Sequence, residues 1–126
     1  MSDAVLDSSA ILALLFGEPG EEKVRAKLPG ALLSAVNCAE IVSKLCERGM
    51  PAFEARAAIE ALGVEVIDFG IDQACAVGEL RNRTCAVGLS LGDRACLALA
   101  RERKVTAITA DVAWAKLAGF EVELIR

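Results

Sequence analysis

The chain has 126 residues, of which 55% are hydrophobic, and its formal net charge is −4. This length favours a single domain over residues 1–126, and it is enough to bury a self-sufficient core. The acidic balance argues against a nucleic-acid binder that works by basic surface alone, and the absence of His excludes Ser-His-Asp and Cys-His catalysis.

The sequence shows no pattern of a membrane span or a secretory signal. The longest run without a charged residue covers residues 28–39 and is interrupted by Pro, Gly, Ser and Asn. It falls short of the ~20 apolar residues that a spanning helix needs. The N-terminus carries Asp3 and Asp7, and no Lys or Arg precedes Lys23, which is untypical of a secretory signal. We therefore expect a cytoplasmic protein that does not associate with membranes.

The first half of the chain alternates short apolar runs with helical patterns. We expect strands at residues 5–7, 31–34 and 64–69, and helices at residues 9–16, 21–27, 37–48 and 51–62. The clearest helix is 37–48, whose apolar side chains recur at i, i+3, i+4, i+7 and i+8. Gly49 ends this helix, and Pro51 is expected at the first position of the next one.

The second half continues the alternation. Helices are expected at residues 71–81, 90–104 and 111–117, strands at 105–109 and 121–125, and a connection at 82–88. Strands that alternate with helices indicate an α/β protein with a mostly parallel sheet. The predicted fold is a three-layer α/β/α sandwich with about five strands in its central sheet.

The cysteines contain no C-x-x-C pair, and most of them fall on apolar helical stripes. Their positions are Cys38, Cys46, Cys75, Cys85 and Cys96. Because free Cys behaves as a small buried hydrophobe, we expect buried thiols rather than disulfides or a zinc site.

Two aspartates follow predicted strands directly. Asp7 comes after the first strand and Asp111 after the strand 105–109. Ligands of open α/β sheets bind outside the carboxyl ends of strands, so chemistry is expected there. Each aspartate could instead cap the helix that follows it, and the sequence pattern leaves both interpretations open.

Two further carboxylates lie in the first turns of helices. Asp93 starts the apolar face of its helix, where it could point at a charged group or form a capping box with Ser90. Glu40 lies opposite the apolar stripe of its helix. For Glu40 the pattern alone favours a solvated side chain that pairs with Lys44 at i+4.

Four segments together resemble the motifs of a known family. They are residues 5–10 (Val-Leu-Asp-Ser-Ser-Ala), 34–41 (Ser-Ala-Val-Asn-Cys-Ala-Glu-Ile), 89–100 (Leu-Ser-Leu-Gly-Asp-Arg-Ala-Cys-Leu-Ala-Leu-Ala) and 109–114 (Thr-Ala-Asp-Val-Ala-Trp). In order and spacing, over the whole chain, they look like the motifs of PIN domains. The most similar subgroup is the VapC-type toxins of bacterial toxin–antitoxin pairs.

The resemblance implies a three-layer α/β/α fold and a metal-dependent ribonuclease with Mg²⁺ or Mn²⁺ as its cofactor. It maps metal ligands and catalytic roles onto Asp7, Glu40, Asp93 and Asp111. Ser9 matches a supporting polar position, as does Thr109. It further implies an RNA substrate, a cognate antitoxin protein and a homodimer.

Three arginines are candidates for contacting RNA, namely Arg81, Arg83 and Arg94. Solvated surface charge is the alternative interpretation for all three.

The chemistry of the residues agrees with the resemblance. Clustered carboxylates repel one another and favour a hard divalent cation with oxygen ligands. A bound ion would lower the pKa of its water and polarise a scissile phosphate, which needs no His. Two alternatives remain open: a non-catalytic receiver-type module with an acidic pocket, and a related phosphatase or nuclease that acts on another phosphate ester.

Overall fold

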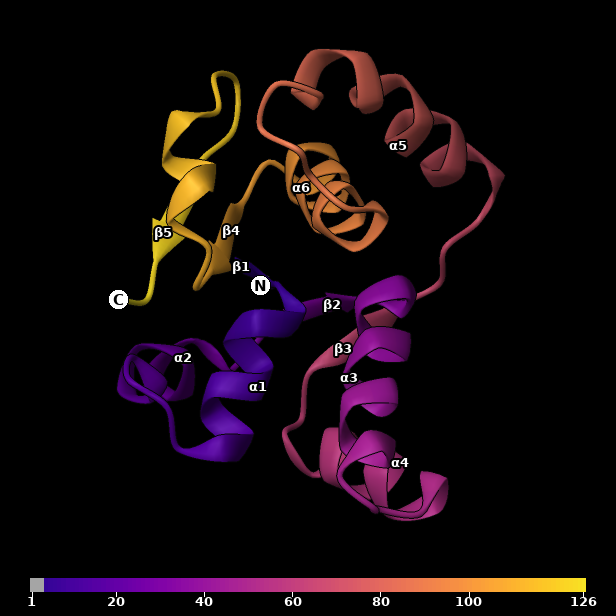
Figure 1. The fold of residues 1–126 in the computed structure, drawn as a ribbon, viewed down its shortest axis with the longest axis vertical. Coiled ribbons are helices and arrows are strands. Elements are labelled where there is room, and N and C mark those ends of the chain that lie inside the picture. Colours follow the sequence, from indigo (N-terminus) through magenta and orange to yellow (C-terminus); the bar gives the residue numbers. More distant parts are fainter. Residues whose placement is uncertain (1–3) are drawn as a thin grey trace.

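The structure of the protein is a computed structural model that describes residues 4–126. At its centre, five short strands form one sheet in the order β3-β2-β1-β4-β5, and every neighbouring pair is parallel (Figure 1). The strands are β1 (Ala4–Leu6), β2 (Leu32–Ser34), β3 (Glu65–Ile67), β4 (Thr106–Thr109) and β5 (Val122–Leu124). The predicted five-stranded parallel sheet is thereby confirmed.

Helices cover both faces of this sheet. They are α1 (Ser8–Phe16), α2 (Glu21–Lys27), α3 (Ala35–Glu47), α4 (Ala52–Ala61), α5 (Ile71–Thr84), α6 (Leu91–Arg103) and the 3₁₀ helix η1 (Val112–Lys116). In Figure 1, α1 to α4 lie on one side of the strands, and α5 and α6 lie on the other. The predicted three-layer α/β/α sandwich is confirmed.

The two-fold period of the strands explains why the sheet has two apolar faces. Leu6, Leu33 and Ile108 belong to the core shared with α1 to α4. Their neighbours Val5 and Leu32 belong to the core shared with α6. Successive side chains of a strand point to opposite faces, so a sheet that is covered twice needs apolar residues throughout.

The boundaries of several elements differ from the sequence expectations. Helix α5 continues through the predicted connection to Thr84, whose buried hydroxyl donates to the carbonyl of Leu80 at 2.7 Å in the last turn. Pro51 has ψ of 148° and precedes α4 as its N-cap instead of opening the helix. The helix expected at 111–117 is a 3₁₀ helix from Val112 to Lys116.

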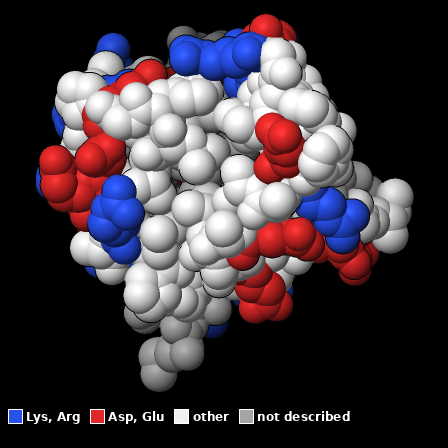
Figure 2. All heavy atoms as spheres, turned by 90° about the horizontal axis from the view of Figure 1, so that it is seen from below, with Lys and Arg blue, Asp and Glu red and all other residues white. Residues whose placement is uncertain are grey.

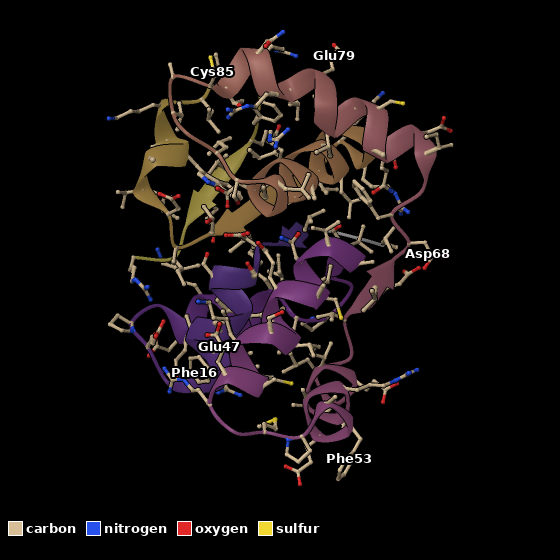
Figure 3. All side chains as sticks on the ribbon, turned by 45° about the vertical axis from the view of Figure 1, so that its right-hand side comes forward. Phe16, Glu47, Phe53, Asp68, Glu79 and Cys85 are labelled. Atoms are coloured by element: carbon tan, nitrogen blue, oxygen red, sulfur yellow. The ribbon has the colours of Figure 1, made fainter. Side chains whose placement is uncertain are left out.

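The expectation that most cysteines are buried is wrong. All five are free thiols, but only Cys96 is buried, and Cys46, Cys75 and Cys85 are exposed. Figure 3 shows Cys85 at the outer end of α5. In α5 the core-facing positions are Val77, Leu80 and Thr84, so the cysteines fall beside that stripe.

Within residues 4–126, no helix is long and apolar enough to cross a membrane.

Candidate functional site

The site lies where the strand order changes direction along the chain. From β1 the chain goes to β2 on one side, and later to β4 on the other side. Asp7 follows β1, and Thr109 ends β4. The crevice outside the carboxyl ends of two such strands is the usual ligand site of an open α/β sheet.

Two hydroxyl groups hold one oxygen of the Asp7 carboxylate. Ser9 Oγ donates to Asp7 Oδ2 at 2.7 Å, and Thr109 Oγ1 donates to the same oxygen at 2.9 Å. Each hydroxyl also accepts a backbone N–H, from Ala110 and Asp111 respectively, both at 3.0 Å. Each hydroxyl thus accepts one backbone N–H and donates its single proton to Asp7.

Asp7 does not cap α1 with its side chain, so the capping interpretation fails at this residue. The residue is 3% exposed, and its Oδ1 is buried without a hydrogen-bond partner. Burial raises the pKa of Asp7 to about 6, against the Ser9 and Thr109 hydrogen bonds that lower it. The nearby charges of Asp93 and Glu40 raise this pKa further. A buried carboxylate with an unpaired oxygen is the group that a cation would stabilise most.

Glu40 is half-buried and is held at the site by two hydrogen bonds. Its Oε1 accepts from Ser8 Oγ at 2.9 Å and from Asn37 Nδ2 at 3.0 Å. Lys44 pairs with Glu47 at 3.8 Å, so the expected Glu40–Lys44 pair is wrong. The reason is a tertiary contact, because Ser8 of α1 lies against the first turn of α3. Its charge-assisted hydrogen bond to Glu40 is more favourable than an exposed ion pair with Lys44.

Asn37 links the carboxylate of Glu40 to helix α6. Its buried side-chain amide donates to the backbone carbonyl of Gly92 at 3.0 Å as well as to Glu40. The N-termini of α3 and α6 are therefore linked, and their carboxylates Glu40 and Asp93 lie near enough to Asp7 to raise its pKa. Asn37 and Ser8 are not among the predicted site residues. A signal for Asn37 is its position three residues before Glu40, on the same helical face.

Asp93 and Asp111 both cap helices, as one interpretation of each predicted. Asp93 Oδ2 accepts from Ser90 N at 2.9 Å, and Ser90 Oγ accepts from Asp93 N at 3.1 Å, which completes a capping box. Asp111 Oδ1 accepts from Ala113 N at 3.0 Å at the start of η1. Each cap uses one carboxylate oxygen, so capping does not exclude a second role for the other oxygen.

The four carboxylates lie close enough to influence one another. Burial raises the pKa of Asp93, and the charges of Asp111 and Glu40 add to this rise against the Ser90 hydrogen bonds. Mutual repulsion of this kind fits a cation with oxygen ligands. Within residues 4–126, however, no three Asp, Glu or Cys side chains are already grouped as a metal-binding set.

The three arginine candidates lie outside this cluster. Arg81 and Arg83 are exposed in the last turn of α5. Arg94 Nη1 donates to the carbonyl of Val77 at 2.9 Å, and its Nε is buried without a partner. Arg94 thus joins α6 to α5 in this structure.

The fold and the site define an α/β protein with an acidic centre at the switch point of its sheet. The PIN domain family matches residues 4–120, so the chain belongs to the PIN domain family. No curated protein shows significant similarity to the chain.

Solved structures share the fold at low sequence identity. A toxin–antitoxin complex from Klebsiella pneumoniae superposes with a TM-score of 0.78 at 20% identity, covering 98% of each chain. DNA-bound VapBC from Salmonella typhimurium gives a TM-score of 0.76 at 17% identity over 100% of each chain. VapC20 from Mycobacterium tuberculosis, a Sarcin-Ricin loop cleaving toxin, gives 0.74 at 22% identity, covering 94% of this chain and 96% of that one. The family match and these structures together show that the chain has the fold of a PIN domain.

Proposed function

We propose that the protein is a metal-dependent ribonuclease and the toxin of a toxin–antitoxin pair. The observation that carries the proposal is Asp7, which is buried at the switch point with an unpaired oxygen. Its pKa is raised by burial and by the charges of Asp93 and Glu40. A structural carboxylate would cap its helix or pair with a base, and Asp7 does neither with its side chain. Perturbed carboxylates at such a position are typical of functional sites.

Asp7, Glu40, Asp93 and Asp111 would hold Mg²⁺ or Mn²⁺ through carboxylate oxygens. When bound, the ion would supply a water of lowered pKa and offset the charge on the scissile phosphate. Ser9 and Thr109 would keep Asp7 oriented with Oδ1 directed away from their hydroxyl groups. Ser8 and Asn37 would do the same for Glu40, since both bond to Oε1. Such supporting hydrogen bonds orient ligands and tune their affinity.

An RNA substrate, a cognate antitoxin and a homodimer complete the proposal. Support for the antitoxin comes from similar structures described as toxin–antitoxin or VapBC complexes. Support for RNA comes from VapC20, described as a Sarcin-Ricin loop cleaving toxin. Figure 2 shows broad uncharged areas between scattered acidic and basic groups, which is surface that partners could cover. Within residues 4–126, the exposed large hydrophobic residues are Phe53, Val66, Ile71, Leu91 and Val112.

The test is RNA cleavage by the purified protein with Mg²⁺, with Mn²⁺ and with EDTA, beside Asp7→Asn. A matched control is Asp72→Asn, which changes an exposed aspartate in the first turn of α5. We expect metal-dependent cleavage by the parent and the control, and none by Asp7→Asn. Parallel assays with DNA and with phosphomonoesters distinguish a ribonuclease from a related nuclease or phosphatase that acts on another phosphate ester. Cleavage by Asp7→Asn at the parent rate would show that the site is misassigned, and absence of both cleavage and metal binding would favour a binding module.

A further inference from the structure

A cavity of about 430 Å³ opens between the end of α5, η1 and the segment leading to β5. Figure 1 shows that this segment and the end of α5 lie on the same side of the molecule. The side chains that line it include Arg83, Val87, Lys116, Leu117 and Phe120. This cavity is separate from the four carboxylates, none of which lines it.

The cavity is cationic in an acidic protein. Arg83 and Lys116 line it, and no carboxylate does. Two other cavities within residues 4–126 each include a glutamate, Glu121 in one and Glu60 in the other. The whole chain has a net charge of −4, whereas the lining of this cavity carries two positive charges and no negative one. Such a place attracts an anionic group.

The remaining walls of the cavity are apolar. Val87, Leu117 and Phe120 are half-buried, so each keeps part of its surface open. Proteins bind single-stranded nucleic acid by combining a cationic rim for the backbone with aromatic and apolar surfaces for the bases. The cavity provides both kinds of surface, and its volume is within the usual range of small-molecule sites.

The cavity lies at the end of η1 that is farther from the acidic site, beside the amino end of β5. Along the chain, Val87 precedes Ser90 and the Asp93 capping box by only a few residues. Asp111 caps the start of η1, and Lys116 is the last residue of η1. At about 2 Å of rise per residue, a 3₁₀ helix of this length separates the backbones of Asp111 and Lys116 by roughly 10 Å. A strand of RNA at the carboxylates could therefore reach the cavity within a few nucleotides.

We propose that this cavity is an RNA subsite that receives one nucleotide a few positions away from the cleavage position. Arg83 and Lys116 would contact phosphate, and the base would lie against Val87, Leu117 and Phe120. The proposal rests on the ribonuclease function proposed above. It predicts that RNA outside the scissile bond contributes to affinity through this cavity, and not through the basic surface of the chain in general.

The test uses the double variant Arg83→Gln/Lys116→Gln. Its control is Lys23→Gln/Arg25→Gln, which removes the same charge from exposed positions of α2. Binding of a short single-stranded oligoribonucleotide is measured against salt concentration in the Asp7→Asn background, where no cleavage is expected. Each phosphate contact on a single strand contributes about −0.7 to the slope of log K against log salt. We expect the slope to be smaller by about 1.4 in the cavity variant and unchanged in the control.

Cleavage kinetics with intact Asp7 provide the second measurement. The cavity variant should raise KM several-fold and leave kcat close to that of the parent, because the cavity contacts RNA away from the reacting phosphate. Equal salt slopes for the cavity variant and the α2 control would overturn the proposal. If the parent cleaves no RNA, the ribonuclease function fails, while the salt slopes still decide whether the cavity binds RNA.

Discussion

The carboxylate of Glu40 occupies the space that a side chain at residue 92 would need. A Cβ built on Gly92 would overlap both carboxylate oxygens of Glu40. Gly92 lies in the first turn of α6 beside Asp93 and is buried. Its backbone conformation is not left-handed, so the requirement for glycine is steric and comes from Glu40.

Gly92→Ala should therefore lower activity and raise helix stability at the same time. The added methyl group displaces the Glu40 carboxylate from Ser8 and Asn37, which hold it in place. Within a helix, alanine is more favourable than glycine by about 1 kcal/mol, which partly offsets the lost hydrogen bonds. We expect cleavage to fall at least ten-fold with little change in the melting temperature.

Gly78→Ala is the matched control for this prediction. Gly78 is an exposed residue of α5, and a Cβ there meets no atom within 4 Å. This variant should raise stability and leave cleavage unchanged. If Gly92→Ala also cleaves at the parent rate, the position of Glu40 does not matter for activity.

Asn37→Ala tests whether the link between α3 and α6 supports the site. The substitution removes one donor to Glu40 and leaves the Gly92 carbonyl without this partner. Loss of a supporting hydrogen bond of this kind typically weakens metal affinity 10–100-fold. Calorimetric titration with Mn²⁺ should show that loss, while Ser43→Ala on the exposed part of α3 should bind as the parent does. Equal Mn²⁺ affinities of Asn37→Ala and Ser43→Ala would show that Asn37 does not support metal binding.

Much of the fold could be predicted because its signals are local. Apolar runs with intervening helical periods are sufficient to place five strands and their helices, and the covered sheet faces confirm this. Asp7 and Asp111 were found because each follows a strand, and parallel strands end at one edge of the sheet. The Asp93 capping box was also visible as a Ser-x-x-Asp spacing.

What the sequence pattern could not predict depends on contacts between distant segments. Glu40 meets Ser8 across 32 residues, and Asn37 meets Gly92 across 55. Helical periodicity places Glu40 on a polar face but does not say whether solvent or another helix lies there. In the same way, the cysteines fit the spacing of apolar stripes, and only the packing of α3 and α5 shows which of them are exposed.

Ser90→Ala and Asp93→Asn should separate the two roles of this capping pair. Removing the Ser90 hydroxyl should destabilise α6 by about 1 kcal/mol, the usual value of a helix cap. Cleavage should persist, because Asp93 keeps its charge and still accepts from the backbone N–H of Ser90. Asp93→Asn should abolish cleavage with a smaller loss of stability. Urea unfolding and RNA cleavage of both variants provide the comparison, and equal cleavage by the two variants would mean that Asp93 is a cap alone.

The raised pKa of Asp7 predicts an unusual dependence of stability on pH. The pKa is about 6 in the folded protein and 3.8 without burial, so between these values the folded state binds more protons than the unfolded state. The contribution of Asp7 to the free energy of unfolding therefore falls as pH rises from 3.8 to about 6, by about 3 kcal/mol in total. Asp7→Asn lacks this loss, so in urea its advantage over the parent should grow between pH 4 and pH 7. Metal binding requires the ionised carboxylate and should strengthen over the same range. If the free energies of unfolding of the parent and of Asp7→Asn change with pH in the same way, ionisation of Asp7 does not destabilise the folded protein.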